Sequence, residues 1–219
     1  MLLITVLASI VTVMMGLIVL IAWRRWGSLD SGARWIAGGA AVFFVWSLIA
    51  IATVVLGRRT RLFQEIPILL GTCCYLKGFA DWQPRRGQRR LILAALVAFV
   101  GLWIVAQGVQ GVTDRFSTIS GPIHATMMTA AAGYTLITRV QATGERWTTQ
   151  PWFWISTGFM LVYGTEAVLD PLWENIFGLR NDLVLAAGVV HHIGSIVGYA
   201  LMIRGLVEAS PGEIVAPAG

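Results

Sequence analysis

All three histidines of the chain lie inside long apolar segments, His124 in one segment and the adjacent pair His191 and His192 in another. A titratable imidazole costs free energy in hydrocarbon unless another group satisfies it, so histidine at membrane depth indicates a functional site. Imidazole nitrogens accept hydrogen bonds, ligate metals and exchange protons near neutral pH. These residues are therefore the first candidates for a binding site.

Polar residues at helical spacing accompany the histidines. Tyr163, Glu166 and Asp170 follow one another at i, i+3 and i+7, which places them on one helix face. Ser195 and Tyr199 lie about one and two turns after the histidine pair. We predict a polar pocket in the outer half of three consecutive helices, with these ligand-binding residues: His124, Glu166, His191, His192, Tyr163, Asp170, Ser195 and Tyr199.

The elements that carry these residues are apolar. Of the 219 residues, 57% are hydrophobic and 12% are charged, and the mean hydropathy is +0.74, which is typical of a polytopic membrane protein. A helix of about 20 residues crosses roughly 30 Å of hydrocarbon, and backbone groups in lipid must bond internally. The sequence predicts an all-α bundle of seven transmembrane helices within residues 1–208, at about 2–23, 35–55, 62–79, 91–110, 117–137, 151–171 and 183–206, followed by a short cytoplasmic tail, 209–219.

Three helix ends are predicted from polar and proline residues. Glu65 and Pro67 suit a helix entrance at the level of the lipid headgroups, where proline is tolerated in the first turn. Pro151 is expected to begin the sixth helix and Pro171 to end it.

The loop arginines predict the orientation, because cytoplasmic loops carry an excess of Lys and Arg. The richer side contains Arg24, Arg25, Arg34, Lys77, Arg85, Arg86, Arg89, Arg90, Arg139, Arg146 and Arg204, and the other side contains Arg58, Arg59, Arg61, Arg115 and Arg180. We therefore expect the N-terminus outside and the C-terminus in the cytoplasm, in a bacterial inner membrane. The net charge of +5 needs no nucleic-acid partner, because basic loops at an anionic leaflet explain it.

Most tryptophans fall near the predicted helix ends, where amphipathic rings anchor a helix at the membrane interface. This prediction covers Trp23, Trp26, Trp35, Trp82, Trp147, Trp152, Trp154 and Trp173. Trp46 and Trp103 are deeper and are expected in packed core positions.

The histidine cluster allows four uses. It could be a structural network in which Glu166 pairs with a histidine, or an outward-facing ligand pocket whose occupancy is read by a partner. It could bind haem b through His124 and one of His191 or His192, or zinc through His124, His191 and Glu166 with a bound water. We favour a non-enzymatic receptor-like, sensory or accessory subunit that acts through other membrane proteins. A single-haem electron-transfer subunit is the alternative, and a small-solute carrier and a zinc-dependent membrane hydrolase are minor alternatives.

In length, helix number and topology the chain is similar to the seven-helix input modules of some bacterial sensor kinases. Its architecture also resembles that of the microbial rhodopsins, whose retinal is attached to a lysine midway along the last helix. Lys77 is the only lysine here and lies in the third predicted helix. A retinal Schiff base is therefore not expected.

A faint internal repeat appears when the sequence is shifted by 119 residues. The shift carries Trp35, Ile36 and Gly39 onto Trp154, Ile155 and Gly158, and it carries Thr72 and Cys73 onto His191 and His192. Helices one to three and five to seven would then be parallel halves joined by the fourth, as in repeats related by an axis along the membrane normal.

Overall fold

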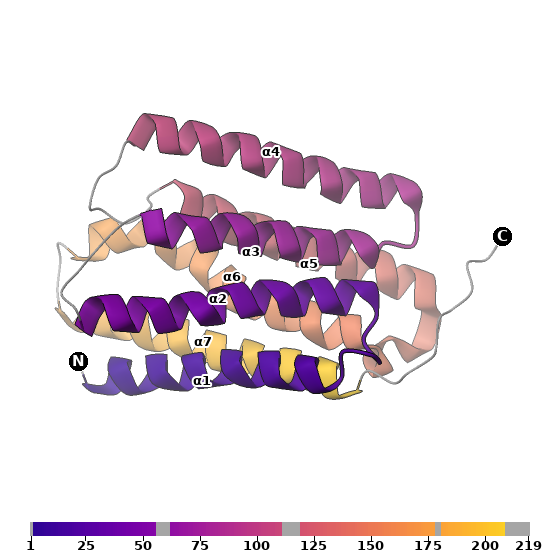
Figure 1. The fold of residues 1–219 in the computed structure, drawn as a ribbon, viewed down its shortest axis with the longest axis horizontal. Helices are drawn as coiled ribbons and strands as arrows, with labels where there is room; N and C mark the ends of the chain where they lie inside the picture. The colour runs from indigo at the N-terminus through magenta and orange to yellow at the C-terminus, as the bar shows by residue number, and fades with distance from the viewer. Residues whose placement is uncertain (1, 56–61, 111–118, 178–180, 209–219) are drawn as a thin grey trace.

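The computed structural model describes residues 2–55, 62–110, 119–177 and 181–208, and within them the chain is helical throughout, without strands (Figure 1). The helices are α1 (Leu2–Arg24), α2 (Ser31–Val55), α3 (Leu62–Asp81), α4 (Arg86–Gln110), α5 (Ser120–Thr143), α6 (Pro151–Phe177) and α7 (Asn181–Glu208), with a short 3-10 helix, η1 (Gly144–Thr149), before α6. The predicted all-α class is confirmed. The expected tail, 209–219, lies outside the described residues.

Membrane-spanning character is clear for four of the described helices. The apolar stretches 3–24, 31–52, 86–109 and 185–208, in α1, α2, α4 and α7, are long and hydrophobic enough to cross a bilayer. Large apolar side chains cover the outside of the bundle, among them Val13, Val97 and Ile193, which are more than half exposed. Such a surface fits lipid and not water, and the chain is an integral membrane protein.

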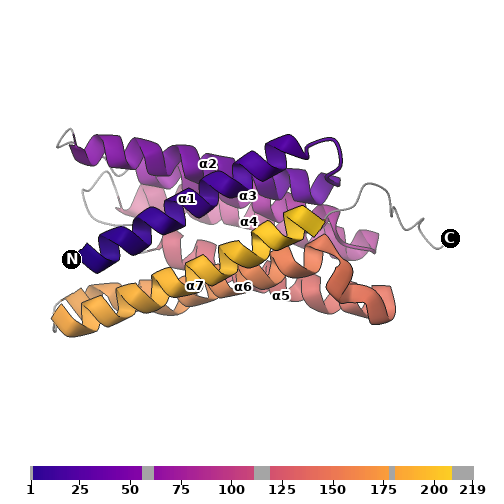
Figure 2. The same cartoon turned by 90° about the horizontal axis from the view of Figure 1, so that it is seen from below.

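The helices alternate in direction, so every helix end falls at one of two ends of the bundle (Figure 1). We call these the Leu2 end, where α1 begins, and the Arg24 end, where α1 finishes. Neighbour contacts close α1, α2, α3, α5, α6 and α7 into a ring, in which α1 touches α7 and α3 touches α5. Figure 2 shows α1 crossing between α2 and α7. Helix α4 packs outside this ring, against α3 and α5.

Local sequence explains several helix starts. The Asp30 carboxylate caps α2 by accepting the Ala33 backbone N–H at 2.7 Å. The side chain of Gln88 accepts the Arg85 backbone N–H at 3.2 Å as α4 begins. Pro151 opens α6 as predicted, because the first turn needs no donor there. Pro171 does not end α6, which continues to Phe177, so that predicted boundary is wrong.

The ring is filled by aromatic side chains from α3 and α6. Phe79 and Phe159 are fully buried, with ring centroids 5.0 Å apart, and Tyr75 packs edge-on against Phe159 at 4.7 Å. Two tryptophans predicted at the lipid interface, Trp82 and Trp152, are instead 2% exposed. Trp82 donates to Asp30, and Trp152 lies under the guanidinium of Arg139, so polar partners at the helix ends hold both rings inside.

Candidate functional site

His124 lies on α5, one turn after its first residue, and only 4% of its surface is exposed. Its Nδ1 is 2.6 Å from the hydroxyl of Thr72 on α3. That hydroxyl donates its one proton to the Ile68 carbonyl at 2.5 Å, so it can only accept from His124. From these two contacts we infer that the proton of the neutral imidazole is on Nδ1 and that Nε2 carries a lone pair. Among the described residues Nε2 has no hydrogen-bond partner.

Aromatic rings from three other helices surround the His124 imidazole. Tyr163 on α6 packs edge-on at 4.9 Å between centroids, and Phe43 on α2 and Phe99 on α4 lie at 5.8 and 6.5 Å. Leaving a buried polar atom without a partner costs about 1–3 kcal/mol. The basic Nε2 atom is thus held in an apolar enclosure, where a donor group or a metal ion would interact with it strongly. We call His124, Thr72, Phe43, Phe99 and Tyr163 the His124 site.

A second polar contact lies next to this site, toward the Leu2 end. The Glu65 carboxylate is fully buried and accepts hydrogen bonds from Ser120 at 2.6 Å and from the indole of Trp103 at 3.2 Å. Ser120 precedes His124 by one turn of α5, and Glu65 precedes Thr72 by two turns of α3. Glu65 lies in the first turn of α3, as predicted, and Ser120 and Trp103 hold its carboxylate inside the bundle. Its level relative to the lipid headgroups stays a prediction.

Polar contacts with α5 continue just beyond the end of α3, toward the Arg24 end. Gln83 donates to the Thr135 hydroxyl at 2.9 Å and accepts from the Thr138 hydroxyl at 2.8 Å. All three side chains are buried. Together with the Glu65–Ser120 and Thr72–His124 pairs, they line one helix interface along its length. We call this interface the α3–α5 seam.

Tyr163 and Glu166 also meet residues from α3 and α7. Tyr163 is 5% exposed and lies 6.1 Å from Tyr75 between ring centroids. Glu166 is half-buried on α6, three residues after Tyr163, and Tyr199 on α7 packs against the core cluster that contains Tyr163. The predicted site residues Tyr163, Glu166 and Tyr199 therefore share one region of the bundle, and Tyr163 connects it to His124. The side chain of Asp170 lies outside the described residues.

The α7 histidines form a separate pair. Their rings contact each other edge-on at 5.1 Å, and His192 Nδ1 donates to the Gly188 carbonyl at 2.6 Å. Ser195 donates to the backbone carbonyl of His191 and not to its ring. His191 Nδ1 is buried and makes no hydrogen bond with the described residues. The described rings that contact His124 are those of Phe43, Phe99 and Tyr163. These contacts do not join His124 to the His191–His192 pair.

The described part of the chain contains no group of three His, Cys, Asp or Glu side chains arranged to hold a metal ion. The set His124, His191 and Glu166 suggested for zinc is therefore not assembled there. In a haem site, His124 Nε2 would be the axial ligand offered by α5, because its lone pair is not engaged by a described residue.

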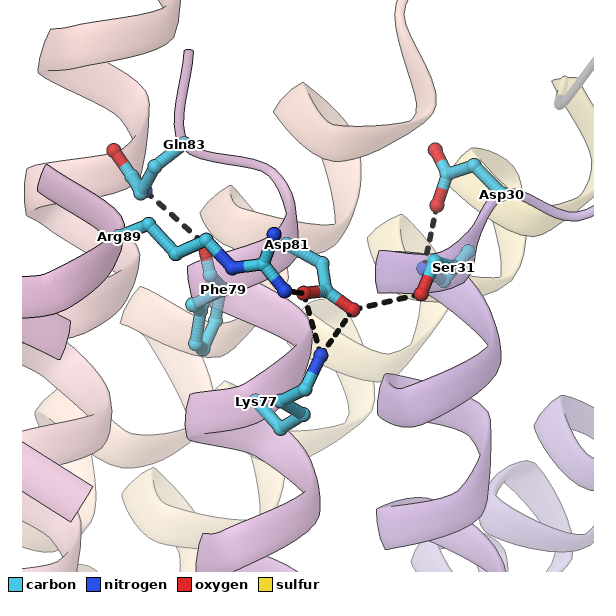
Figure 3. A network of polar contacts seen from close by, with 8 residues as sticks. Asp30, Ser31, Lys77, Phe79, Asp81, Gln83 and Arg89 are labelled. Carbon is cyan, nitrogen blue, oxygen red and sulfur yellow. Dashed lines mark hydrogen bonds and ion pairs between the residues drawn. The ribbon is translucent and has the colours of Figure 1, made fainter. Parts of the chain in front are cut away.

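A separate ionic network lies at the Arg24 end and was missed by the sequence reasoning (Figure 3). The Asp81 carboxylate at the end of α3 receives Lys77 at 2.5 Å, Arg89 at 3.0 Å and the Ser31 hydroxyl at 2.7 Å. It ties the starts of α2 and α4 to the end of α3. Lys77 precedes Asp81 by four residues, a spacing that suggests an ion pair, but the partners on α2 and α4 come only from the fold.

Comparisons with protein-family models, with curated proteins and with solved structures found no match.

Proposed function

We propose that this chain is a non-enzymatic, receptor-like membrane protein that binds a small molecule at the His124 site and acts through other membrane proteins. In this proposal all seven helices span a bacterial inner membrane, with the N-terminus outside and the C-terminus in the cytoplasm. The site then lies in the outer half of the bundle, because His124 is near the Leu2 end of α5.

The observation that carries the proposal is the buried Nε2 atom of His124, which lies among aromatic side chains and has no hydrogen-bond partner in the described part of the chain. Most buried side-chain polar atoms in folded proteins have a hydrogen-bond partner, and a ligand would supply one here. The chemistry of the site favours a ligand with one hydrogen-bond donor and an aromatic or apolar body. Tyr163 on α6 connects the site to Tyr75 on α3, so ligand contact with Tyr163 would reach both helices.

A matched pair of small probes tests this proposal. Phenol carries a donor hydroxyl, and toluene has the same ring without it. In nanodiscs, phenol should bind wild-type protein more tightly than toluene by about 1 kcal/mol, roughly fivefold in Kd, because it satisfies Nε2. In His124→Leu the advantage of phenol should vanish. Equal preference for phenol in the two proteins would contradict the proposal.

A haem b subunit remains the second candidate, because a neutral imidazole with its Nε2 lone pair available is the state that ligates iron. An absorption spectrum of protein from its native membrane, oxidised and then reduced with dithionite, separates the two. A Soret band that moves on reduction and disappears in His124→Leu would favour haem. A colourless wild-type protein would favour the receptor-like function.

A further inference from the structure

Two helix pairs, α2–α3 and α6–α7, cross each other in the same way. A methyl group on Gly78 would lie 2.9 Å from both the Gly32 carbonyl oxygen and Ile36. A methyl group on Gly205 would lie 2.8 Å from the Pro151 carbonyl oxygen and 2.7 Å from Ile155. A shift of 119 residues carries the α2 positions 32 and 36 onto the α6 positions 151 and 155, and a shift of 127 carries position 78 onto 205.

The same two shifts relate further contacts along these pairs. Gly71 faces the Phe43 ring, and its counterpart Gly198 faces Val162, the counterpart of Phe43. The agreement therefore extends beyond one glycine in each pair.

A third correspondence joins Gly39 and Gly158. Gly39 makes room for Tyr75, while Gly158 makes room for Met202, the counterpart of Tyr75. Because α3 and α7 differ by 127 residues and not by 119, Thr72 corresponds to Tyr199. The earlier alignment of Thr72 with His191 is wrong, since eight additional residues separate the paired positions of α6 and α7.

The polar ends of both pairs repeat as well. Lys77 lies over the ring of Trp35 and pairs with Asp81 four residues later. Arg204 lies over the ring of Trp154 and pairs with Glu208 four residues later. The shifts of 119 and 127 relate each of these residues to its counterpart, so a cation, an indole and a carboxylate recur in the same arrangement.

The remaining ring helices complete two equivalent halves. Helix α1 packs on α2 as α5 packs on α6, and the halves meet where α1 touches α7 and where α3 touches α5. Helix α4 lies outside and joins the halves (Figure 1). The halves run parallel, because α2 and α6 both begin at the Arg24 end (Figures 1 and 2).

Packing at the glycine crossings within each half differs from packing at the α3–α5 contact between the halves. Glycines bring α2 against α3 and α6 against α7 so closely that a methyl group would collide with backbone. Between the halves, the α3–α5 seam is instead held by hydrogen bonds between side chains, at Glu65–Ser120, Thr72–His124 and Gln83–Thr135. Side-chain hydrogen bonds can exchange partners at lower cost than interlocked backbones can separate.

We propose that the chain consists of two copies of one three-helix unit, α1–α3 and α5–α7, which rock against each other as rigid bodies and carry a small hydrogen-bonding solute across the membrane through the α3–α5 seam. Parallel repeats related by an axis along the membrane normal, with the substrate at the boundary between them, are a known plan for carriers. The inference rests on the proposed function of the His124 site for its substrate, since that site lies in the seam. It goes beyond that function by giving the site access to both ends of the bundle.

Distances between pairs of spin labels test the movement. The half-buried thiols Cys73 and Cys74 are first replaced by alanine. One pair joins the halves at the Leu2 end, Ile51→Cys with Val168→Cys, and another joins them at the Arg24 end, Arg24→Cys with Thr148→Cys; all four positions are exposed. Arg24→Cys with Ile51→Cys lies within one half and is the control.

The proposal predicts two distance populations for each pair that joins the halves. A molecule that is open at the Leu2 end is closed at the Arg24 end. The fraction of molecules with the longer distance at the Leu2 end should therefore equal the fraction with the shorter distance at the Arg24 end. The control pair should give one population. One population for every pair, or simultaneous widening at both ends, would overturn the inference. Saturating phenol should shift the two populations; if they are present but do not respond to phenol, the movement stands and the proposed function of the His124 site fails.

Discussion

At the residue scale, the protonation of His124 follows from the threonine beside it. The Thr72 hydroxyl has one proton and lies 2.5 Å from the Ile68 carbonyl oxygen, from which we infer that the imidazole donates from Nδ1. The sequence identified His124 as a candidate but could not reveal this state. Thr72 is 52 residues away, and nothing in the pattern of α3 marks it as the partner of a histidine.

We predict that nitrogen NMR of histidine-labelled protein will show His124 as a neutral imidazole with its proton on Nδ1. The variants His191→Gln and His192→Gln assign the three signals. A proton on Nε2 would mean that the Thr72 contact is reversed, and it would remove the acceptor on which the proposed ligand site depends.

Asp81 is the ionic residue whose loss should matter most at the Arg24 end. Its side chain is 8% exposed, whereas those of Lys77 and Arg89 are 29% and 51% exposed. We expect Asp81→Asn to lower the free energy of unfolding by about 1–2 kcal/mol, less than the roughly 3–5 kcal/mol for a fully buried pair.

Glu208→Gln is the matched control, because the Arg204–Glu208 pair is exposed on both sides, at 52% and 35%. That change should cost less than about 1 kcal/mol. Equal losses for the two variants, measured by reversible unfolding in mixed micelles, would show that the Asp81 network has no special role.

At the scale of elements, glycine positions decide which helices can approach closely. We predict that Gly78→Leu and Gly205→Leu each destabilise the protein by more than about 2 kcal/mol, because a side chain there meets the backbone of the neighbouring helix. Gly101→Leu on α4 is the control, since a side chain there meets no atom within 4 Å. If Gly101→Leu is as damaging as the other two, the collision at the helix crossings does not explain the losses.

The helices were largely predictable and their contacts were not. Apolar runs about as long as a bilayer predicted all the ring helices, and Pro151 gave the start of α6, because these signals are local. The place of Glu65 in the first turn of α3 was predictable, but its burial was not. Its burial depends on Ser120 and Trp103, which the fold brings in from α5 and α4.

At the scale of the whole molecule, the contacts described here reveal a repeat that the sequence gives only faintly. Identical residues recur at two different shifts, so no one alignment without a gap displays them together. The polar α3–α5 seam also depends on ring closure, because every hydrogen bond across it joins residues more than 50 positions apart.

The orientation of the bundle has its own test. In a variant without Cys73 and Cys74, we expect Gly87→Cys to resist a membrane-impermeant maleimide in intact cells and to react in inverted membrane vesicles. Gly87 is exposed near the start of α4, among the arginines that predict a cytoplasmic Arg24 end. Labelling in intact cells would reverse the orientation and place the His124 site in the inner half of the bundle.

The central claim is that His124 serves a ligand and not the fold, and the unfolding free energy of His124→Leu tests it most directly. Thr72 keeps its bond to Ile68 in this variant and the Nε2 atom is gone, so stability should rise or fall by less than about 1 kcal/mol. Phe159→Ala, which empties a fully buried position, should lose about 3–5 kcal/mol in the same assay. A loss above about 2 kcal/mol for His124→Leu would contradict the claim and make His124 a structural residue.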